Sequence, residues 1–296
     1  MEAIPEVIEL SEHLEVLQPQ SQTVPLVFAS PHSGTKYPPW FVAASRLDPV
    51  ALRRSEDCFV DRLFAAAPEQ GAPLLRALFP RAFIDPNREP FELDPAMFED
   101  ALPSYANTAS ARVAAGLGTI ARVVTNGQEI YRDKLRFAEA AERIGTYYRP
   151  YHRALQDLLE ATRRRFGCYL LVDCHSMPSV GGPMDPDAGR GRADFVIGDC
   201  FGSSCEDIVA ATIEKSLRDM GYTVLRNRPY AGGFTTSNYG KPSAGLHAVQ
   251  IEINRALYMD ENKIEAHAGL EPLAGKLAQL IGALATSVSA RDLKPK

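Results

Sequence analysis

The sequence contains no uninterrupted run of eighteen or more apolar residues, so it predicts no transmembrane helix. Its first twenty residues, MEAIPEVIELSEHLEVLQPQ, lack the basic start and the apolar stretch of a secretory signal peptide. Cysteine is also scarce: there are five, an odd number without CxxC spacing, which fits a reducing compartment better than a disulfide framework. We therefore expect a cytoplasmic protein with no membrane partner.

Basic residues are also fewer than acidic ones. The chain has 32 Lys and Arg against 37 Asp and Glu, for a formal net charge of −5. Binding to nucleic acid requires a basic surface that neutralises phosphates, so we expect no nucleic-acid partner. The glycine-rich segments lack the strand-loop-helix context of a nucleotide fingerprint, and no GxSxG elbow supports a serine nucleophile.

What remains is an ordinary globular composition, 45% hydrophobic and 23% charged, which we interpret as a single domain spanning residues 1–296. Short apolar runs predict strands at 24–30, 168–176, 193–199, 223–227 and 247–255. Amphipathic stretches predict helical regions at 48–71, 137–166, 205–220 and 261–290. Strands that alternate with helices indicate an α/β sheet covered by helices on both faces. Two loops rich in glycine and proline, 178–193 and 229–245, are expected beside a site.

Two histidines stand where predicted strands end, His32 after 24–30 and His175 at the end of 168–176. Ligands of open α/β sheets gather outside the carboxyl ends of strands, so two imidazoles there could converge on one zinc ion. Asp57 and its neighbour Glu56 are candidates for a third, oxygen ligand, and Asp173 could orient an imidazole. The alternative is that both histidines are hydrogen-bonded loop residues. Glu56 and Asp57 would then be acidic residues at a helix N-terminus, where the helix dipole favours negative charge.

Glu252 is the most unusual carboxylate, because it lies within the strand-like segment AVQIEIN. Alternation places Gln250, Glu252 and Asn254 on one polar face, which either meets solvent or lines a buried cleft. A carboxylate at the rim of a metal cleft could act as a general base, whereas the alternative is a structural salt bridge to Arg255 or Arg228.

Several arginines lie near predicted chain breaks. Arg81, Asn87 and Arg88 cluster around the break at Asp85-Pro86-Asn87-Arg88, and Arg132 lies in EIYRDKL. The planar guanidinium group binds a carboxylate through two parallel hydrogen bonds, so these residues suggest an anionic substrate. Gly232 and Gly233 would allow the backbone to approach a ligand closely.

Seven segments, taken in order, resemble the N-formylglutamate amidohydrolase family over roughly residues 24 to 260. They are SPHSGTKYP (30–38), SEDCFVDRL (55–63), RAFIDPNREP (81–90), IYRDKL (130–135), LVDCHSMPS (171–179), DFVIGD (194–199) and PYAGGFTTSNYGKPSAGLHAVQIEINR (229–255). Each segment is weakly diagnostic alone, but the ordered set is specific. The family is similar in turn to zinc carboxypeptidases and aspartoacylase, and this implies a three-layer α/β/α fold around a mixed sheet, one zinc ion and a metal-activated water.

The resemblance also implies roles for individual residues. His32, Asp57 and His175 would hold the zinc ion, with Glu56 the alternative to Asp57, since the HxxE motif of the distant relatives is absent and Thr35 stands three residues after His32. Arg81 would polarise the scissile carbonyl, and Glu252 would act as the general base. The residues expected to contact the substrate are Asn87, Arg88, Arg132, Gly232, Gly233 and His247.

The function predicted is hydrolysis of the amide bond in a small anionic N-acyl amino acid, with N-formyl-L-glutamate the leading candidate. The alternatives are another zinc deacylase or carboxypeptidase-like hydrolase, and a catalytically inactive small-molecule binding protein on the same fold.

Overall fold

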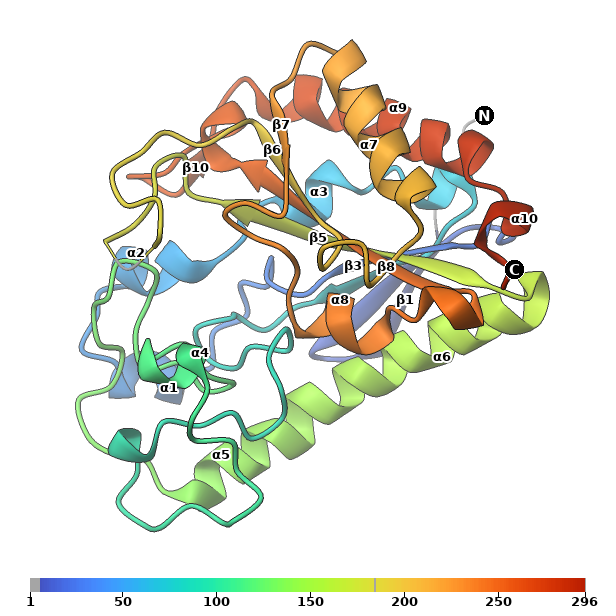
Figure 1. Cartoon of the computed structure of the whole chain (residues 1–296). Coiled ribbons are helices and arrows are strands. Elements are labelled where there is room, and N and C mark those ends of the chain that lie inside the picture. The colour runs from blue at the N-terminus through green and yellow to red at the C-terminus, as the bar shows by residue number, and fades with distance from the viewer. Residues whose placement is uncertain (1–5, 184, 296) are drawn as a thin grey trace.

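A mixed eight-stranded sheet runs through the centre of the computed structural model, which describes residues 6–183 and 185–295 (Figure 1). The strand order is β1-β2-β4-β3-β5-β8-β6-β7. The strands are β1 (Glu6–Ser11), β2 (Leu14–Gln18), β3 (Leu26–Ser30), β4 (Leu74–Ala77), β5 (Tyr169–Met177), β6 (Phe195–Gly198), β7 (Val224–Arg226) and β8 (Leu246–Asn254). A separate small hairpin pairs β9 (Met259–Asp260) with β10 (Glu265–Ala266).

Helices cover both faces of this sheet, so the predicted three-layer α/β/α architecture is confirmed. α6 and α8 pack on one face, and α3, α7 and α9 lie on the other (Figure 1). The helices are α1 (Pro39–Ala44), α2 (Pro49–Leu52), α3 (Val60–Leu63), α4 (Ala111–Ala114), α5 (Phe137–Arg143), α6 (Arg149–Phe166), α7 (Asp207–Asp219), α8 (Phe234–Tyr239), α9 (Leu270–Ser287) and α10 (Ala290–Leu293). None of those in the described part of the chain is long and apolar enough to cross a membrane.

The central strand β5 shows why the apolar runs form this sheet. All nine of its residues are buried, as expected for a strand covered on both faces. Leu170 and Val172 belong to the core beneath α7 and α9, whereas Leu171 belongs to the core beneath α6. Successive side chains of a strand point to opposite faces, so one apolar run supplies both cores.

The four strands β4, β3, β5 and β8 are parallel, so their carboxyl ends meet at one edge of the sheet. The β5–β8 register pairs His175 with Glu252 and Asp173 with Gln250. Polar residues at the ends of two separate apolar runs are therefore neighbours, and this edge carries the candidate site.

Two predicted helical regions are wrong in detail. Residues 48–71 form α2, a 3₁₀ turn (Arg53–Ser55), a connecting segment, α3 and a second 3₁₀ turn (Pro68–Gln70). The helix is interrupted because Glu56 and Asp57 are buried with tertiary polar partners, and the backbone N–H of Asp57 donates to the carbonyl of His32 at 3.0 Å. Residues 261–269 contain β10 and a turn, so α9 begins only at Leu270.

The other predicted elements are close to the observed ones. The predicted helix 137–166 consists of α5 and α6, joined by a π-helical turn at Ile144–Tyr148. The sequence interpretation missed the N-terminal hairpin of β1 and β2, and it missed α8 inside the loop 229–245.

Candidate metal centre and cleft

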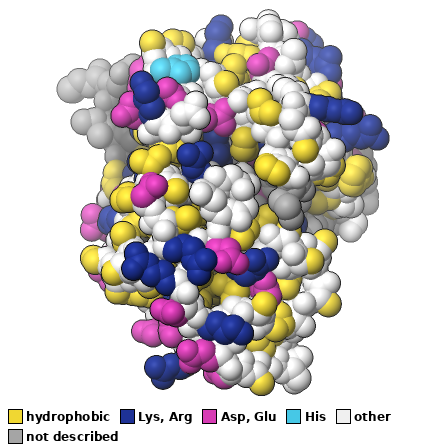
Figure 2. All heavy atoms as spheres, turned by 90° about the vertical axis from the view of Figure 1, so that its left-hand side faces the viewer, with side chains coloured by type: hydrophobic (Ala, Val, Ile, Leu, Met, Phe, Trp, Pro, Cys, Tyr) yellow, Lys and Arg dark blue, Asp and Glu magenta, His cyan; other side chains and the backbone are white. Residues whose placement is uncertain are grey.

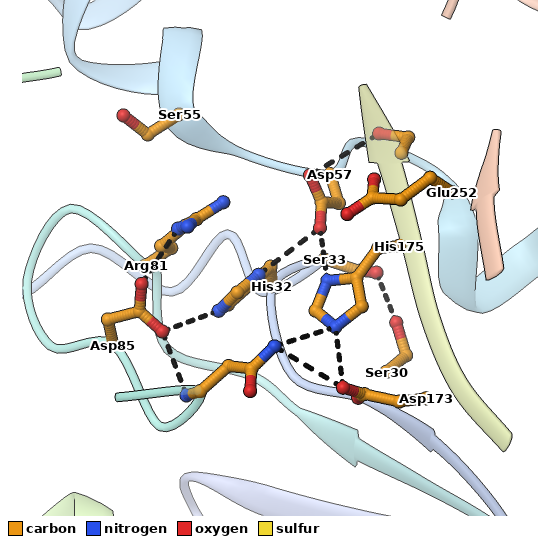
Figure 3. Close-up of polar contacts among 12 residues, drawn as sticks. Ser30, His32, Ser33, Ser55, Asp57, Arg81, Asp85, Asp173, His175 and Glu252 are labelled. Atoms are coloured by element: carbon orange, nitrogen blue, oxygen red, sulfur yellow. Dashed lines mark hydrogen bonds and ion pairs between the residues drawn. The ribbon is translucent and has the colours of Figure 1, made fainter. Parts of the chain in front are cut away.

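Two imidazoles and one carboxylate converge at the carboxyl edge of the sheet (Figure 3). His32 follows the end of β3, His175 lies in β5, and Asp57 comes from the segment that precedes α3. Asp57 Oδ2 lies 2.9 Å from His175 Nδ1 and 3.2 Å from His32 Nδ1. All three side chains are buried, and one ligand atom from each lies within 4.8 Å of the others.

This group fits a divalent metal ion. Ligand atoms held at about 2.0–2.1 Å around a tetrahedral ion lie about 3.3 Å from one another, close to the two distances from Asp57 Oδ2. Neutral imidazole and carboxylate are also the donor types that such ions take in proteins. Three protein ligands leave a fourth position for water or substrate, the pattern of catalytic rather than structural sites.

The outer nitrogen of each imidazole contacts an aspartate. His32 Nε2 lies 2.7 Å from Asp85 Oδ1, and His175 Nε2 lies 3.0 Å from Asp173 Oδ2 (Figure 3). An Nε2–H donated to a carboxylate leaves the Nδ1 lone pair free to ligate, so both aspartates orient the rings for a metal ion. The contact of Asp173 was foreseen from its spacing to His175, whereas that of Asp85 was not.

Asp57, and not Glu56, is the acid that reaches the imidazoles. Glu56 accepts hydrogen bonds from Tyr37 Oη at 2.6 Å, from Arg53 Nε at 3.1 Å and from Cys58 Sγ at 3.1 Å. These contacts turn its carboxylate away from the two rings. Of the two acids considered from the sequence, only Asp57 is placed to ligate.

The other oxygen of Asp57 is fixed by groups that the sequence interpretation missed. Arg255 donates to Asp57 Oδ1 at 3.0 Å, and Ser176 Oγ lies 3.4 Å from the same atom. Arg255 also donates to Ser176 Oγ at 3.1 Å. A charge-assisted hydrogen bond of this kind stabilises the ionised carboxylate in a buried position.

Glu252 lies beside this group and lines a cleft of about 370 Å³. Figure 3 shows its carboxylate next to Asp57 and His175, and Gln250 Nε2 donates to its Oε1 at 2.8 Å. Burial raises the pKa of Glu252 to about 7. The structural salt bridge considered from the sequence is absent for Arg255, which pairs with Asp57 instead.

Arg81 and Arg88 line the same cleft, and both approach Asp85. Arg81 Nε donates to Asp85 Oδ2 at 2.9 Å, and the Arg81 side chain remains 23% exposed. Arg88 is more firmly engaged, since it donates to the carbonyls of Leu117 at 2.8 Å and Asn87 at 2.9 Å. Burial raises the pKa of Asp85, but the charges of Arg88, His32 and Arg81 outweigh this and hold it well below its usual value.

Asn87 and the glycine pair also lie at the cleft, with contacts to the protein itself. The Asn87 amide donates to Asp173 Oδ2 at 3.3 Å and accepts from the backbone N–H of Thr235 at 2.8 Å. A Cβ added to Gly233 would lie 2.4 Å from the Asn87 amide, and Gly232 has a φ of +130°. The close approach that requires glycine here is therefore to Asn87.

Two residues that were expected to contact the substrate, Arg132 and His247, lie away from this cleft. Arg132 lies in a separate hollow with Arg46 and Glu129, where its Nε donates to the Ser45 carbonyl at 2.9 Å. His247 is buried at the start of β8, where its ring contacts the Glu206 N–H and the Leu293 carbonyl. It lies five positions before Glu252, about 16 Å along a strand, and thus toward the opposite end of the sheet.

Fold and site together define a three-layer α/β protein with a candidate metal centre in an arginine-lined cleft. The chain matches the description N-formylglutamate amidohydrolase over residues 24–259, and it belongs to this family, as its motifs indicated. It is 32% identical over 253 residues to an N-formylglutamate deformylase from Pseudomonas aeruginosa, with 83% of this chain and 86% of the relative covered. A deformylase of the same name from Pseudomonas putida is 28% identical over 255 residues, covering 84% and 87%.

A solved structure agrees with these sequence relatives. The crystal structure of N-formylglutamate amidohydrolase from Ralstonia eutropha JMP134 superimposes with a TM-score of 0.84 at 38% identity. The match covers 92% of this chain and 97% of that one. The fold and the family predicted from the sequence are thus confirmed.

Proposed function

We propose that this protein is a zinc-dependent amidohydrolase that cleaves N-formyl-L-glutamate into formate and L-glutamate. The observation that carries the proposal is the position of Glu252, a buried carboxylate beside the His32–Asp57–His175 group in a cleft lined by arginines. The names of the relatives from the two Pseudomonas species and from Ralstonia eutropha point to the same substrate.

The proposed metal site consists of His32, Asp57 and His175. A zinc ion bound there would supply Lewis-acid activation of water and of the formyl oxygen. The protein's own contribution is orientation, since Asp85, Asp173 and Arg255 hold the three ligands in place.

Glu252 is the proposed general base. A pKa near 7 leaves its carboxylate able to accept a proton from the attacking water at neutral pH and to deliver it to the departing amide nitrogen. Gln250 holds one oxygen of Glu252 and so directs the other toward the cleft. The reaction balances as amide hydrolysis: the C–N bond of the amide breaks and one C–O bond forms to the water oxygen. Both protons of the water end on the amine nitrogen, so the products at neutral pH are formate and the ammonium form of L-glutamate.

Arg81 is the proposed stabiliser of negative charge on the formyl oxygen. Its guanidinium group is fixed by Asp85, which also contacts His32, so it lies near the proposed metal site before charge develops. Arg88 would add positive charge to the same wall of the cleft and favour an anionic substrate.

Formate release by the purified, metal-analysed protein tests the proposal. We expect stoichiometric formate and L-glutamate from N-formyl-L-glutamate, loss of activity on chelation and its return with Zn²⁺. Absence of formate release from zinc-loaded protein would contradict the proposal and favour the binding-protein alternative, while faster cleavage of a neutral N-acyl amino acid would favour another deacylase.

A further inference from the structure

Arg112 lines the cleft but was not singled out from the sequence. It lies in α4, on the left of Figure 1, and its side chain is partly buried. The short helix is well anchored: Ser110 Oγ accepts from the N–H of Val113 at 3.0 Å and donates to Glu92. The Arg112 carbonyl accepts from the N–H of Leu117 at 2.8 Å, so the backbone that carries the guanidinium group is fixed.

The guanidinium group of Arg112 has no hydrogen bond or ion pair with any residue in 6–183 or 185–295. The other arginines of the cleft are engaged: Arg81 with Asp85, Arg88 with backbone carbonyls and Arg255 with Asp57. Figure 2, which views the molecule from the side of α4, shows basic side chains interspersed with acidic ones, the usual arrangement of a surface that pairs its charges. An unpaired arginine in a cleft is available for an external anion.

Like charge accumulates around this position. Burial, together with the charges of Arg81 and Arg112, lowers the pKa of Arg88 to about 10 although Asp85 opposes the shift. Neighbouring guanidinium groups repel each other, and a bound anion removes that cost. The free protein thus holds positive charge that a dianionic ligand would neutralise.

The place of Arg112 in the cleft indicates which carboxylate of a dianionic substrate it would bind. Asp85 connects His32 to Arg81 and Arg88, so those two arginines belong to the end of the cleft at the imidazoles. Arg112 forms no hydrogen bond or ion pair with Asp85 or with either imidazole. In an N-formyl amino acid the α-carboxylate is next to the scissile amide, whereas the side-chain carboxylate extends away from it.

We propose that Arg112 binds the side-chain carboxylate of the substrate and selects N-acyl amino acids with an acidic side chain. This inference rests on the proposed function, because it assumes that the scissile amide lies at the His32–Asp57–His175 group. Arg112 takes the role that the sequence interpretation gave to Arg132, whose own position is outside the cleft.

The kinetic test compares N-formyl-L-glutamate with N-formyl-L-glutamine, which has the same shape but a neutral side chain. Arg112→Gln should lower kcat/KM for the glutamate substrate about 30-fold or more, mainly through KM, and leave the glutamine substrate nearly unchanged. Arg112→Lys should restore part of the loss. Arg164→Gln, an equal charge change at an exposed position of α6, is the matched control. If Arg112→Gln has the same ratio of kcat/KM for the two substrates as the wild type, the inference is overturned.

A binding test separates this inference from the proposed reaction. Calorimetry on the zinc-loaded protein with L-glutamate and L-glutamine requires no turnover. We expect the wild type to prefer L-glutamate and Arg112→Gln to lose that preference. If the preference depends on Arg112 but formate is never released, the proposed function fails, while the binding of a side-chain carboxylate by Arg112 is retained. If the wild type shows no preference, or Arg112→Gln keeps it, the inference is wrong whatever the activity.

Discussion

Arg255 donates a 3.0 Å hydrogen bond to Oδ1 of Asp57, while Oδ2 of the same carboxylate faces the two imidazoles. The two oxygens of one buried carboxylate thus have different tasks. One is held by a cation of the protein, and the other is presented to the proposed metal ion. This division makes Arg255 a positioning residue for Asp57, although it is distant in the sequence.

The first prediction concerns this pair. Arg255→Met should lower the zinc affinity about 10- to 100-fold, because the carboxylate loses its orienting partner. It should also lower the melting temperature, since removing one member of a buried pair leaves the other charge uncompensated. Competition with a chromogenic chelator measures the zinc affinity. Arg255→Lys keeps the charge, so its zinc affinity should lie between those of the wild type and Arg255→Met. Unchanged affinity in a folded Arg255→Met protein would contradict the role.

The second prediction separates Asp57 from Glu56. Asp57→Ala should abolish zinc binding, because it removes a ligand. Glu56→Ala should bind zinc nearly as well as the wild type but lose about 2 kcal/mol of unfolding free energy, since Tyr37 and Arg53 lose their buried acceptor. Metal analysis and urea unfolding give the two readouts. Zinc loss in a folded Glu56→Ala protein would reassign the ligand.

The third prediction is the effect of removing the base. Glu252→Gln keeps the size of the side chain, so zinc content and thermal stability should hardly change, while kcat should fall roughly 10²- to 10⁴-fold. Formate release measured on zinc-loaded protein provides the readout. Wild-type kcat in that variant would end the assignment of Glu252 as the base.

A fourth prediction follows from the pKa of Glu252, which burial raises to about 7. The base acts only when ionised, so kcat/KM should fall about tenfold for each pH unit below the inflection. In the zinc-loaded enzyme the inflection should lie at pH 7 or lower, because a nearby cation favours the carboxylate. The residual activity of Glu252→Gln should lack this inflection; its persistence would assign the titration to another group.

The fifth prediction is a loss of stability in acid caused by His152. This ring is buried between Tyr239 Oη at 2.8 Å and the Pro86 carbonyl at 2.9 Å, and burial lowers its pKa from 6.5 to about 4. The unfolded chain binds this proton more readily, so stability is lost as the pH falls from about 6.5 toward 4, by about 3 kcal/mol. Urea unfolding at pH 7 and 4 should show a smaller difference in His152→Gln than in the wild type. If the free energy of unfolding falls equally in both proteins between pH 7 and pH 4, His152 is not the group responsible.

The sequence predicted those parts of the site in which a long apolar run ends in polar residues. β3 and β5 are such runs, so His32 and His175 could be placed at one edge before any coordinates were known. Glu252 stood out for the same reason, as a carboxylate within a core strand. These inferences hold because the burial of a central strand is determined by its local composition.

The pairing of buried polar groups could not be predicted in this way. Asp85 contacts His32 and Arg255 contacts Asp57 across 53 and 198 positions of the chain. No local pattern encodes such distances, and the tertiary contacts of Asp57 also help to interrupt the helix expected at 48–71. Arg112 was not singled out, because its place in the cleft depends on tertiary packing. His247 was expected to contact the substrate although it is the first residue of the predicted strand 247–255, and it lies at the amino end of β8, away from the site.

The β5–β8 register has a consequence for how this scaffold tolerates change. His175 and Glu252 are opposite each other on adjacent strands, so their separation is set by the strand spacing of about 4.8 Å and not by any loop. Arg112 in α4 and the cleft residues of the connection between β7 and α8, by contrast, lie outside the strands. Loops can therefore lengthen, shorten or exchange residues and so change which substrate side chain is accepted. The distance between Glu252 and His175 stays constant meanwhile. Strand pairing therefore fixes the proposed base relative to one proposed metal ligand, whereas no strand fixes the proposed selectivity residue Arg112.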